Sequence, residues 1–179
     1  RKCTSGEIKV NGQDLTNRSS KAGIDLGVAH VPSDRTEVGS SPNLGITDNL
    51  IMKSYRQKPI SKGLSLDQNE ASKFASGLRD KYDIITPSLE TPSRMLSGGN
   101  LQRVILAREF SGEPSLIVAM QPTRGLDVGA IEGVQSLLLK QRDQGAAILL
   151  ISEELEELFA LSDRIYVIYE GMIMGMMDK

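Results

Sequence analysis

Apolar and polar residues follow one another in blocks over the last third of the 179-residue chain. Two segments there are apolar almost throughout, SLIVAM at 115–120 and AAILLIS at 146–152, and a third strand-like segment follows at 164–171. Helical patterns separate these segments at 128–144 and 153–160. Apolar strands that alternate with helices are typical of a parallel sheet covered on both faces. The pattern therefore predicts an α/β fold.

The first residues of the chain predict shorter strands. SGEIKVNG alternates apolar and polar residues through Ile8 and Val10, and then reaches Asn11–Gly12, a dipeptide that favours a tight hairpin. The segment 27–31 is a short apolar strand that Pro32 ends. We therefore expect a short antiparallel β region near the N-terminus, followed by one strand of the α/β core.

The middle of the chain has a different pattern. Residues 36–64 are rich in Gly, Ser, Asn and Pro, which predicts loops with about one helical turn. Helical periodicity then dominates 65–82, where Asp67 and Glu70 have the spacing of a capping box. A further helix is predicted from Ser97 to Phe110.

These patterns predict one domain with a small insertion, which suits the length of the chain. We expect residues 1–35 and 112–179 to form the α/β core, and residues from about 50 to 111 to form a mostly helical subdomain.

Composition argues against several classes of function. The net charge of −2, the aromatic share of 4% and the absence of Trp argue against nucleic-acid binding, which needs clustered cations or stacking platforms. Cys3 is the single cysteine, so no internal disulfide forms. No apolar run approaches the roughly 20 residues of a transmembrane helix, so a membrane role would act through a partner.

The segment RMLSGGNLQRVILAR at 94–108 predicts an anion site. Ser97, Gly98 and Gly99 stand directly before an amphipathic helix. A helix N-terminus has unpaired N–H groups and a partial positive charge, and glycines let a phosphate approach the backbone. Taken alone, a Ser-Gly-Gly tripeptide more often simply begins a helix.

Three motifs in order resemble those of ABC-transporter ATPases. LSGGNLQR at 96–103 resembles the family's signature sequence. QPTRGLD at 121–127 is similar to the loop that follows the family's next apolar strand, and SEELEELFALSDRI at 152–165 is similar to the segment after that. The resemblance covers essentially the whole chain.

The resemblance implies an ABC-ATPase core of the P-loop NTPase type, with a helical subdomain that carries the signature. VPSDR at 31–35 and PTRGLDVGA at 122–130 look most like the second, C-terminal ATPase half of double-length subunits. Such subunits drive the import of simple sugars or nucleosides in bacteria. The cofactors implied are ATP and Mg²⁺.

The partners implied are another ATPase half, in the same polypeptide or in a dimer, and transmembrane permease subunits, with a substrate-binding protein engaged indirectly. The location implied is peripheral, on the cytoplasmic face of the bacterial inner membrane.

One family motif is absent. None of the 17 glycines begins the pattern G-x-x-x-x-G-K-[ST], the loop that cradles phosphates. In the family this loop lies upstream of SGEIKVNG, so we expect that the chain is truncated before it and that the fragment alone binds ATP weakly or not at all.

Four positions depart from the family pattern. Met120 stands where the resemblance implies the magnesium-organising Asp, and Gln121 where it implies the catalytic Glu. A thioether is a poor ligand for Mg²⁺, and an amide cannot accept a proton from water as a carboxylate does. Glu153 occupies the position of the switch His, and Ser33 that of a metal-reaching Gln or Glu. Each change taken singly is also consistent with a tolerated substitution.

The residues implied to bind nucleotide are intact: Ser97, Gly98, Gly99, Asn100 and Asp127. In the family, ATP lies between two halves, and one half supplies the signature to the site of the other. We therefore expect this half to complete the opposite site, while its own hydrolytic site is degenerate. The alternatives are a soluble ABC-type ATPase of DNA repair or translation, and a catalytically silent regulatory half.

Overall fold

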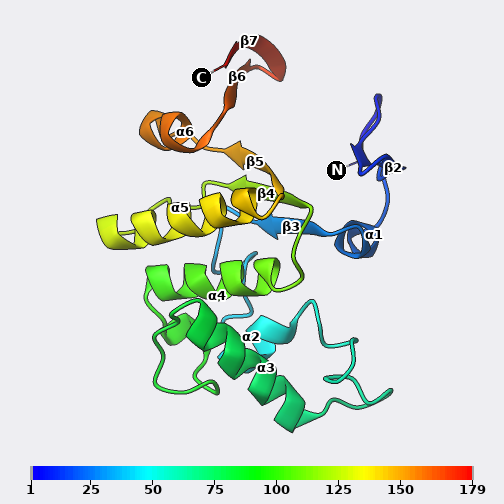
Figure 1. The fold of residues 1–179 in the computed structure, drawn as a ribbon, viewed down its shortest axis with the longest axis vertical. Coiled ribbons are helices and arrows are strands. Elements are labelled where there is room, and N and C mark those ends of the chain that lie inside the picture. The colour runs from blue at the N-terminus through cyan, green and yellow to red at the C-terminus, as the bar shows by residue number, and fades with distance from the viewer. Residues whose placement is uncertain (1, 179) are drawn as a thin grey trace.

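Three parallel strands form the central sheet of the structure, a computed structural model that describes residues 2–178 (Figure 1). They are β3 (Val28–Val31), β4 (Leu116–Met120) and β5 (Ala147–Ile151), in the order β3-β4-β5. The register pairs Val28 with Leu116, and Leu116 with Ala147. The predicted α/β fold with a parallel sheet is confirmed.

Two antiparallel hairpins flank this sheet in sequence. The first joins β1 (Lys9–Val10) to β2 (Gln13–Asp14) through the predicted turn at Asn11–Gly12, where both residues have positive φ. The second joins β6 (Arg164–Tyr169) to β7 (Met172–Asp178), and almost all of its side chains are exposed. In Figure 1 this second hairpin stands beyond α6, at the end of the molecule opposite α2 and α3.

Helices occupy the segments between the strands. Their bounds are α1 (Ser20–Asp25), α2 (Ile46–Ile51), α3 (Gln68–Lys81), the 3₁₀ turn η1 (Ser93–Met95), α4 (Gly98–Phe110), α5 (Val128–Asp143) and α6 (Leu155–Leu161). Helices α2, α3 and α4 contact one another, and α4 also contacts β3 and α5. The single helical turn predicted within 36–64 is therefore α2.

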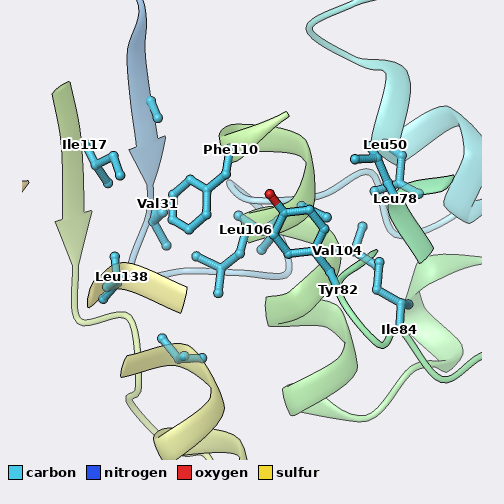
Figure 2. Packing of buried hydrophobic residues seen from close by; sticks show 14 of the residues in the cluster. Val31, Leu50, Leu78, Tyr82, Ile84, Val104, Leu106, Phe110, Ile117 and Leu138 are labelled. Atoms are coloured by element: carbon cyan, nitrogen blue, oxygen red, sulfur yellow. The ribbon is translucent and has the colours of Figure 1, made fainter. Parts of the chain in front are cut away.

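Helix α4 lies at the centre of the packing. In Figure 2 its residues Phe110 and Leu106 lie between Val31 and Ile117 of the sheet on one side and Leu78 of α3 on the other. All of these side chains are buried. One continuous apolar cluster therefore joins the sheet to the α2–α3 region, and it fixes where the beginning of α4 lies.

The start of α3 shows half of the predicted capping box. Asp67 accepts hydrogen bonds from the N–H groups of Asn69 and Glu70. Glu70 instead pairs with Lys73, and the N–H of Asp67 donates to the carbonyl of Ile60. Because Asp67 is the cap, the helix begins at Gln68, a little later than the start predicted at 65.

The sheet is fully covered on only one face within the part of the chain that the structure describes. Ala29, Ile117 and Ala119 are buried against α4 and its neighbours. On β5, by contrast, Leu149 is 54% exposed and Ile151 is 43% exposed. The expectation of a sheet covered on both faces is therefore wrong for β5, because none of the described helices buries these two side chains.

An apolar cavity of about 630 Å³ separates β5 from β6, which do not pair with each other. Leu150, Leu161 and Ile165 are among the side chains that line it. Within residues 2–178, no helix combines the length and the apolarity that crossing a bilayer requires.

Candidate functional site

The first turns of α4 and α5 touch each other. Ser97 caps α4, and Asp127 caps α5 by accepting a hydrogen bond from the N–H of Ala130 at 2.9 Å. A Cβ atom on Gly99 would lie 3.0 Å from the Cβ of Ala130. Two helix N-termini therefore lie side by side, and glycine at position 99 permits this close approach.

Ser97 and Asn100 hold the start of α4 in place. The Ser97 Oγ accepts hydrogen bonds from the N–H of Asn100 at 3.4 Å and from its Nδ2 at 3.1 Å. The Asn100 Oδ1 in turn accepts from the N–H of Ile85 at 2.8 Å. The Asn100 side chain thus links the signature segment to the loop before it.

The N–H groups of Gly98 and Gly99 precede the first intrahelical donor of α4, so the helix itself does not use them. Ser97 and Gly98 are exposed. The arrangement can bind an anion, because these N–H groups, the Ser97 hydroxyl and the positive ends of two helix dipoles all lie at one place.

The loop 121–127 connects β4 to α5. Gln121 begins it with a φ of 49°, in the left-handed region, and its N–H donates to the carbonyl of Ile151 at 2.7 Å. Gly125 also has positive φ, at 66°. The loop closes with a hydrogen bond from the N–H of Leu126 to the carbonyl of Thr123 at 3.1 Å.

A second set of predicted residues follows the carboxyl ends of the three strands. Met120 ends β4, and the bond between Gln121 and Ile151 places the end of β5 beside it. Glu153 follows β5 and is exposed, and Ser33 follows β3. Since neighbouring parallel strands end at one edge of a sheet, all four altered positions share that edge.

The four side chains at this edge offer few ligands for Mg²⁺. Within the described residues, no group of three or more His, Cys, Asp or Glu side chains could hold a metal ion. Met120 offers a thioether and is 42% exposed, while Gln121 and Ser33 offer only neutral oxygens. Mg²⁺ prefers carboxylate and phosphate oxygens, and Glu153 is the single carboxylate among these four side chains.

Arg35 contacts both the first turn of α4 and the loop 121–127. Its guanidinium donates to the carbonyl of Gly98 at 3.5 Å and to the carbonyl of Arg124 in the loop 121–127. Partial burial lowers the pKa of this guanidinium below its ordinary value, but the group remains charged at neutral pH. The sequence interpretation did not identify Arg35 as a site residue.

The comparison with known families supports the resemblance drawn from these motifs. The profile described as "ABC transporter" matches residues 1–124. The chain belongs to the ABC transporter family. A glucose import ATP-binding protein of Haloferax volcanii is 45% identical over 175 residues, which are 97% of this chain and 32% of that protein.

Other members of the ABC transporter family match over the same part of the chain. The guanosine import ATP-binding protein NupO of Bacillus subtilis is 46% identical over 175 residues, which are 98% of this chain and 34% of that protein. The nucleoside import ATP-binding protein NupA of Lactococcus lactis is 40% identical over 177 residues, which are 99% of this chain and 35% of that protein. The chain therefore spans about a third of the length of these curated relatives.

Solved ABC cassettes share the fold. A dimeric bacterial ABC transporter cassette superposes with a TM-score of 0.80 at 20% identity, covering 99% of this chain and 75% of that one. A dimeric cassette in a post-hydrolysis state, bound to ADP and Pi, superposes with a TM-score of 0.78 at 22% identity over the same shares. The predicted ABC-ATPase fold is thereby confirmed.

The predicted site residues of this ABC transporter family member fall into two groups. One group gathers at the paired N-termini of α4 and α5 and comprises Ser97, Gly98, Gly99, Asn100 and Asp127. The other lies at the carboxyl edge of the sheet and comprises Ser33, Met120, Gln121 and Glu153. The loop 121–127 begins in the second group and ends in the first.

One further contact was not anticipated from sequence. Thr123 and Glu157 are both buried, and the Thr123 hydroxyl donates to the Glu157 carboxylate at 2.8 Å. The helical periodicity of α6 is the sequence feature that could have indicated this contact. It places Glu157 on the buried face of the helix, whereas the other acidic residues of the run 153–157 are exposed.

Proposed function

We propose that this chain is part of an ATPase half of an importer for simple sugars or nucleosides, and that it supplies the signature to the ATP site of the opposite half. The observation that carries this proposal is the contrast between the two groups of residues. The anion-binding geometry around Ser97 is intact, whereas the sheet edge around Met120 has a thioether and an amide where the resemblance implies two carboxylates, and Glu153 is its single carboxylate.

The proposed chemistry of the intact group is electrostatic. The N–H groups of Gly98 and Gly99 and the hydroxyl of Ser97 donate to the γ-phosphate that the opposite half holds. Fixed donors at a transferring phosphoryl group lower the barrier mainly by positioning and by stabilising charge. The close approach of Gly99 to Ala130 supports the role, because a side chain at position 99 would crowd Ala130.

At this half's own site we propose a different outcome. Nucleotide bound there is held without hydrolysis or is hydrolysed very slowly, because Gln121 cannot act as a carboxylate base and Met120 is a poor magnesium ligand. Glu153 adds a negative charge after β5, which repels a phosphate. In the full protein the ATP and Mg²⁺ that drive transport would then be used at the opposite site.

The proposed assembly follows from the relatives' names and from the family. The relatives named above are import ATP-binding proteins for glucose, guanosine and nucleosides. We propose that the full protein acts on transported molecules of these two classes, bound to transmembrane permease subunits at the cytoplasmic face of the membrane. A substrate-binding protein would engage the permease rather than this chain.

ATP hydrolysis by the assembled importer tests the proposal. Ser97→Arg fills the space beside the two glycines and should reduce the rate by about a hundredfold, the usual effect of losing a transition-state donor. Ser97→Asp should do the same while still capping α4, because Asp is a good N-cap and repels phosphate. This second variant separates loss of function from loss of folding.

The matched control lies at the sheet edge. Gln121→Asn keeps a residue that tolerates positive φ, and Gln121→Ala removes the amide. Both should change the rate by less than about twofold, because a base that is already absent cannot be lost. If either Gln121 variant were the crippling one while the Ser97 variants remained active, the proposed division of roles would be wrong.

A further inference from the structure

The Arg35 side chain contacts both segments that this half would present to the opposite site. One guanidinium nitrogen lies 3.5 Å from the carbonyl oxygen of Gly98, in the first turn of α4. Another donates to the carbonyl of Arg124, directly before Gly125 in the loop 121–127. We call the first turn of α4 the signature turn. The guanidinium therefore bridges the signature turn and this loop.

The backbone around Arg35 is itself fixed. The Asp34 Oδ1 accepts hydrogen bonds from the N–H groups of Thr36 and Glu37, each at 2.9 Å, and the N–H of Gly39 donates to the carbonyl of Asp34 at 2.8 Å. A Cβ atom on Gly39 would lie 3.0 Å from the Cα of Arg35. This tight turn therefore fixes the backbone position from which the Arg35 side chain extends.

The position of the Arg35 guanidinium is electrostatically unfavourable for a cation. The guanidinium lies beside the N-termini of α4 and α5, whose dipoles carry partial positive charge. The two carbonyl acceptors compensate in part, and a bound anion would compensate further.

The shape of the side chain also matters. Guanidinium is planar and carries several donors in a fixed fork, so it can meet two carbonyls at a set separation. A lysine ammonium carries the same charge on a flexible stem, without that fork. The two residues therefore differ in geometry while they share charge.

We propose that Arg35 is a positioning residue that sets the spacing between the signature turn and the loop 121–127. This inference rests on the proposed function, in which both segments face the opposite ATP site. Arg35 itself touches no nucleotide in this account. It acts through the carbonyls of Gly98 and Arg124.

The test uses the assembled full-length importer and three variants. Arg35→Lys keeps the charge, Arg35→Gln removes it, and Arg142→Gln is the matched control because it makes the same change at an exposed arginine in the last turn of α5. We expect kcat for ATP hydrolysis to fall by about tenfold in both Arg35 variants, since a small misplacement of positioning groups has effects of this order. Arg142→Gln should retain the unmodified rate.

Two further measurements separate positioning from simple loss of structure. The Kd for ADP should be unchanged in Arg35→Lys, because ADP lacks the γ-phosphate that the signature meets. The thermal unfolding midpoint should also be unchanged. A fall in kcat accompanied by a drop in the midpoint of more than about 4 °C would show a structural role and overturn the inference.

The remaining outcomes are also decisive. Arg35→Lys with an unmodified kcat would overturn the inference, because charge without the fork would then suffice. If Ser97→Arg abolishes hydrolysis in the same assembly while Arg35→Lys does not reduce it, only the Arg35 inference fails. If Ser97→Arg leaves hydrolysis unchanged, the proposed function and the inference both fail.

Discussion

Thr123 and Glu157 form a buried hydrogen bond of 2.8 Å between the loop that follows β4 and the helix α6. Thr123 is 5% exposed and Glu157 is 4% exposed. The second carboxylate oxygen of Glu157 is also buried and has no hydrogen-bond partner among residues 2–178. The threonine is thus a principal polar contact of a carboxylate that has left water.

Thr123→Val tests this relationship in the 179-residue chain. Valine keeps the shape of threonine but removes the hydroxyl, so the buried Glu157 carboxylate loses this hydrogen bond. We therefore expect the free energy of unfolding to fall by about 2 kcal/mol. Thr123→Ser keeps the hydroxyl and should lose less. Urea denaturation of the three proteins measures the difference, and equal midpoints would contradict the interpretation.

Glu109 organises the largest buried charge cluster in the described residues. Its carboxylate accepts from Lys53 at 2.8 Å, from the backbone N–H of His30 at 2.9 Å and from Arg108 at 3.0 Å. Because β3 is the edge strand of the sheet, this carboxylate also satisfies one of its open N–H groups. Glu109→Ala should destabilise the chain by about 3–5 kcal/mol, the usual effect of breaking a buried ion pair from one side.

The control for Glu109 is an ion pair in water. Lys21 and Asp25 form an i,i+4 pair whose side chains are 65% and 57% exposed. Asp25→Ala should change the free energy of unfolding by less than about 1 kcal/mol. If both substitutions had the same effect, burial would not be what gives the Glu109 cluster its importance.

Substitution of glycine by alanine should have opposite effects on stability at two positions. A Cβ on Gly39 would lie 2.7 Å from the Cδ1 of Ile105 and 3.0 Å from backbone atoms of Arg35, so Gly39→Ala should destabilise the chain by about 1–3 kcal/mol. Gly77 lies inside α3 with nothing within 4 Å, so Gly77→Ala should stabilise it by about 0.5–1 kcal/mol. Thermal denaturation should therefore move in opposite directions for the two variants.

Asp67 gives the start of α3 a dependence on acid. The pKa of the Asp67 carboxyl is held below its ordinary value of 3.8, mainly by a hydrogen bond from Lys62 and to a lesser extent by one from the backbone N–H of Glu70. A depressed pKa means that the carboxylate stabilises the fold fully above that ordinary value, and that this stability is lost as the pH falls through the folded-state pKa. Circular dichroism between pH 5 and pH 2 should therefore show loss of helix at the acid end.

Lys62→Met should move this acid transition to higher pH, because it removes the largest cause of the lowered pKa. Lys140→Met on α5 removes a charge without touching Asp67 and should leave the transition where it was. An unchanged transition in Lys62→Met would contradict the assignment.

Elements with strong local signals could be predicted from the sequence. The apolar runs that became β4 and β5 and the capped helix from Gly98 to Phe110 needed only periodicity, a cap and flanking turns. The motif around Ser97 was found in the same way, because it combines a cap, two glycines and a helix. The packing of Gly99 on Ala130 could not be predicted, since it depends on where α5 lies.

Contacts between distant segments were missed for the same physical reason. Arg35 meets Gly98 across 63 positions of sequence, and His30 meets Glu109 across 79. Helix α2 has a weak local signal, but its buried Asn49 binds the carbonyls of Ser41, Leu44 and Gly45 and so stabilises it through tertiary contacts. Periodicity carries no information about such pairings.

The proposed division of roles between two ATP sites is tested most directly by a single turnover of the full-length protein in its proposed importer assembly. The enzyme is saturated with radiolabelled ATP, excess nucleotide is removed, and the ADP and ATP that remain bound are measured against time, which separates chemistry from binding and release. We predict that one of the two bound nucleotides becomes ADP rapidly while the other stays ATP, and that Ser97→Arg abolishes the rapid phase. Conversion of both nucleotides at one rate, with or without Ser97→Arg, would contradict the account.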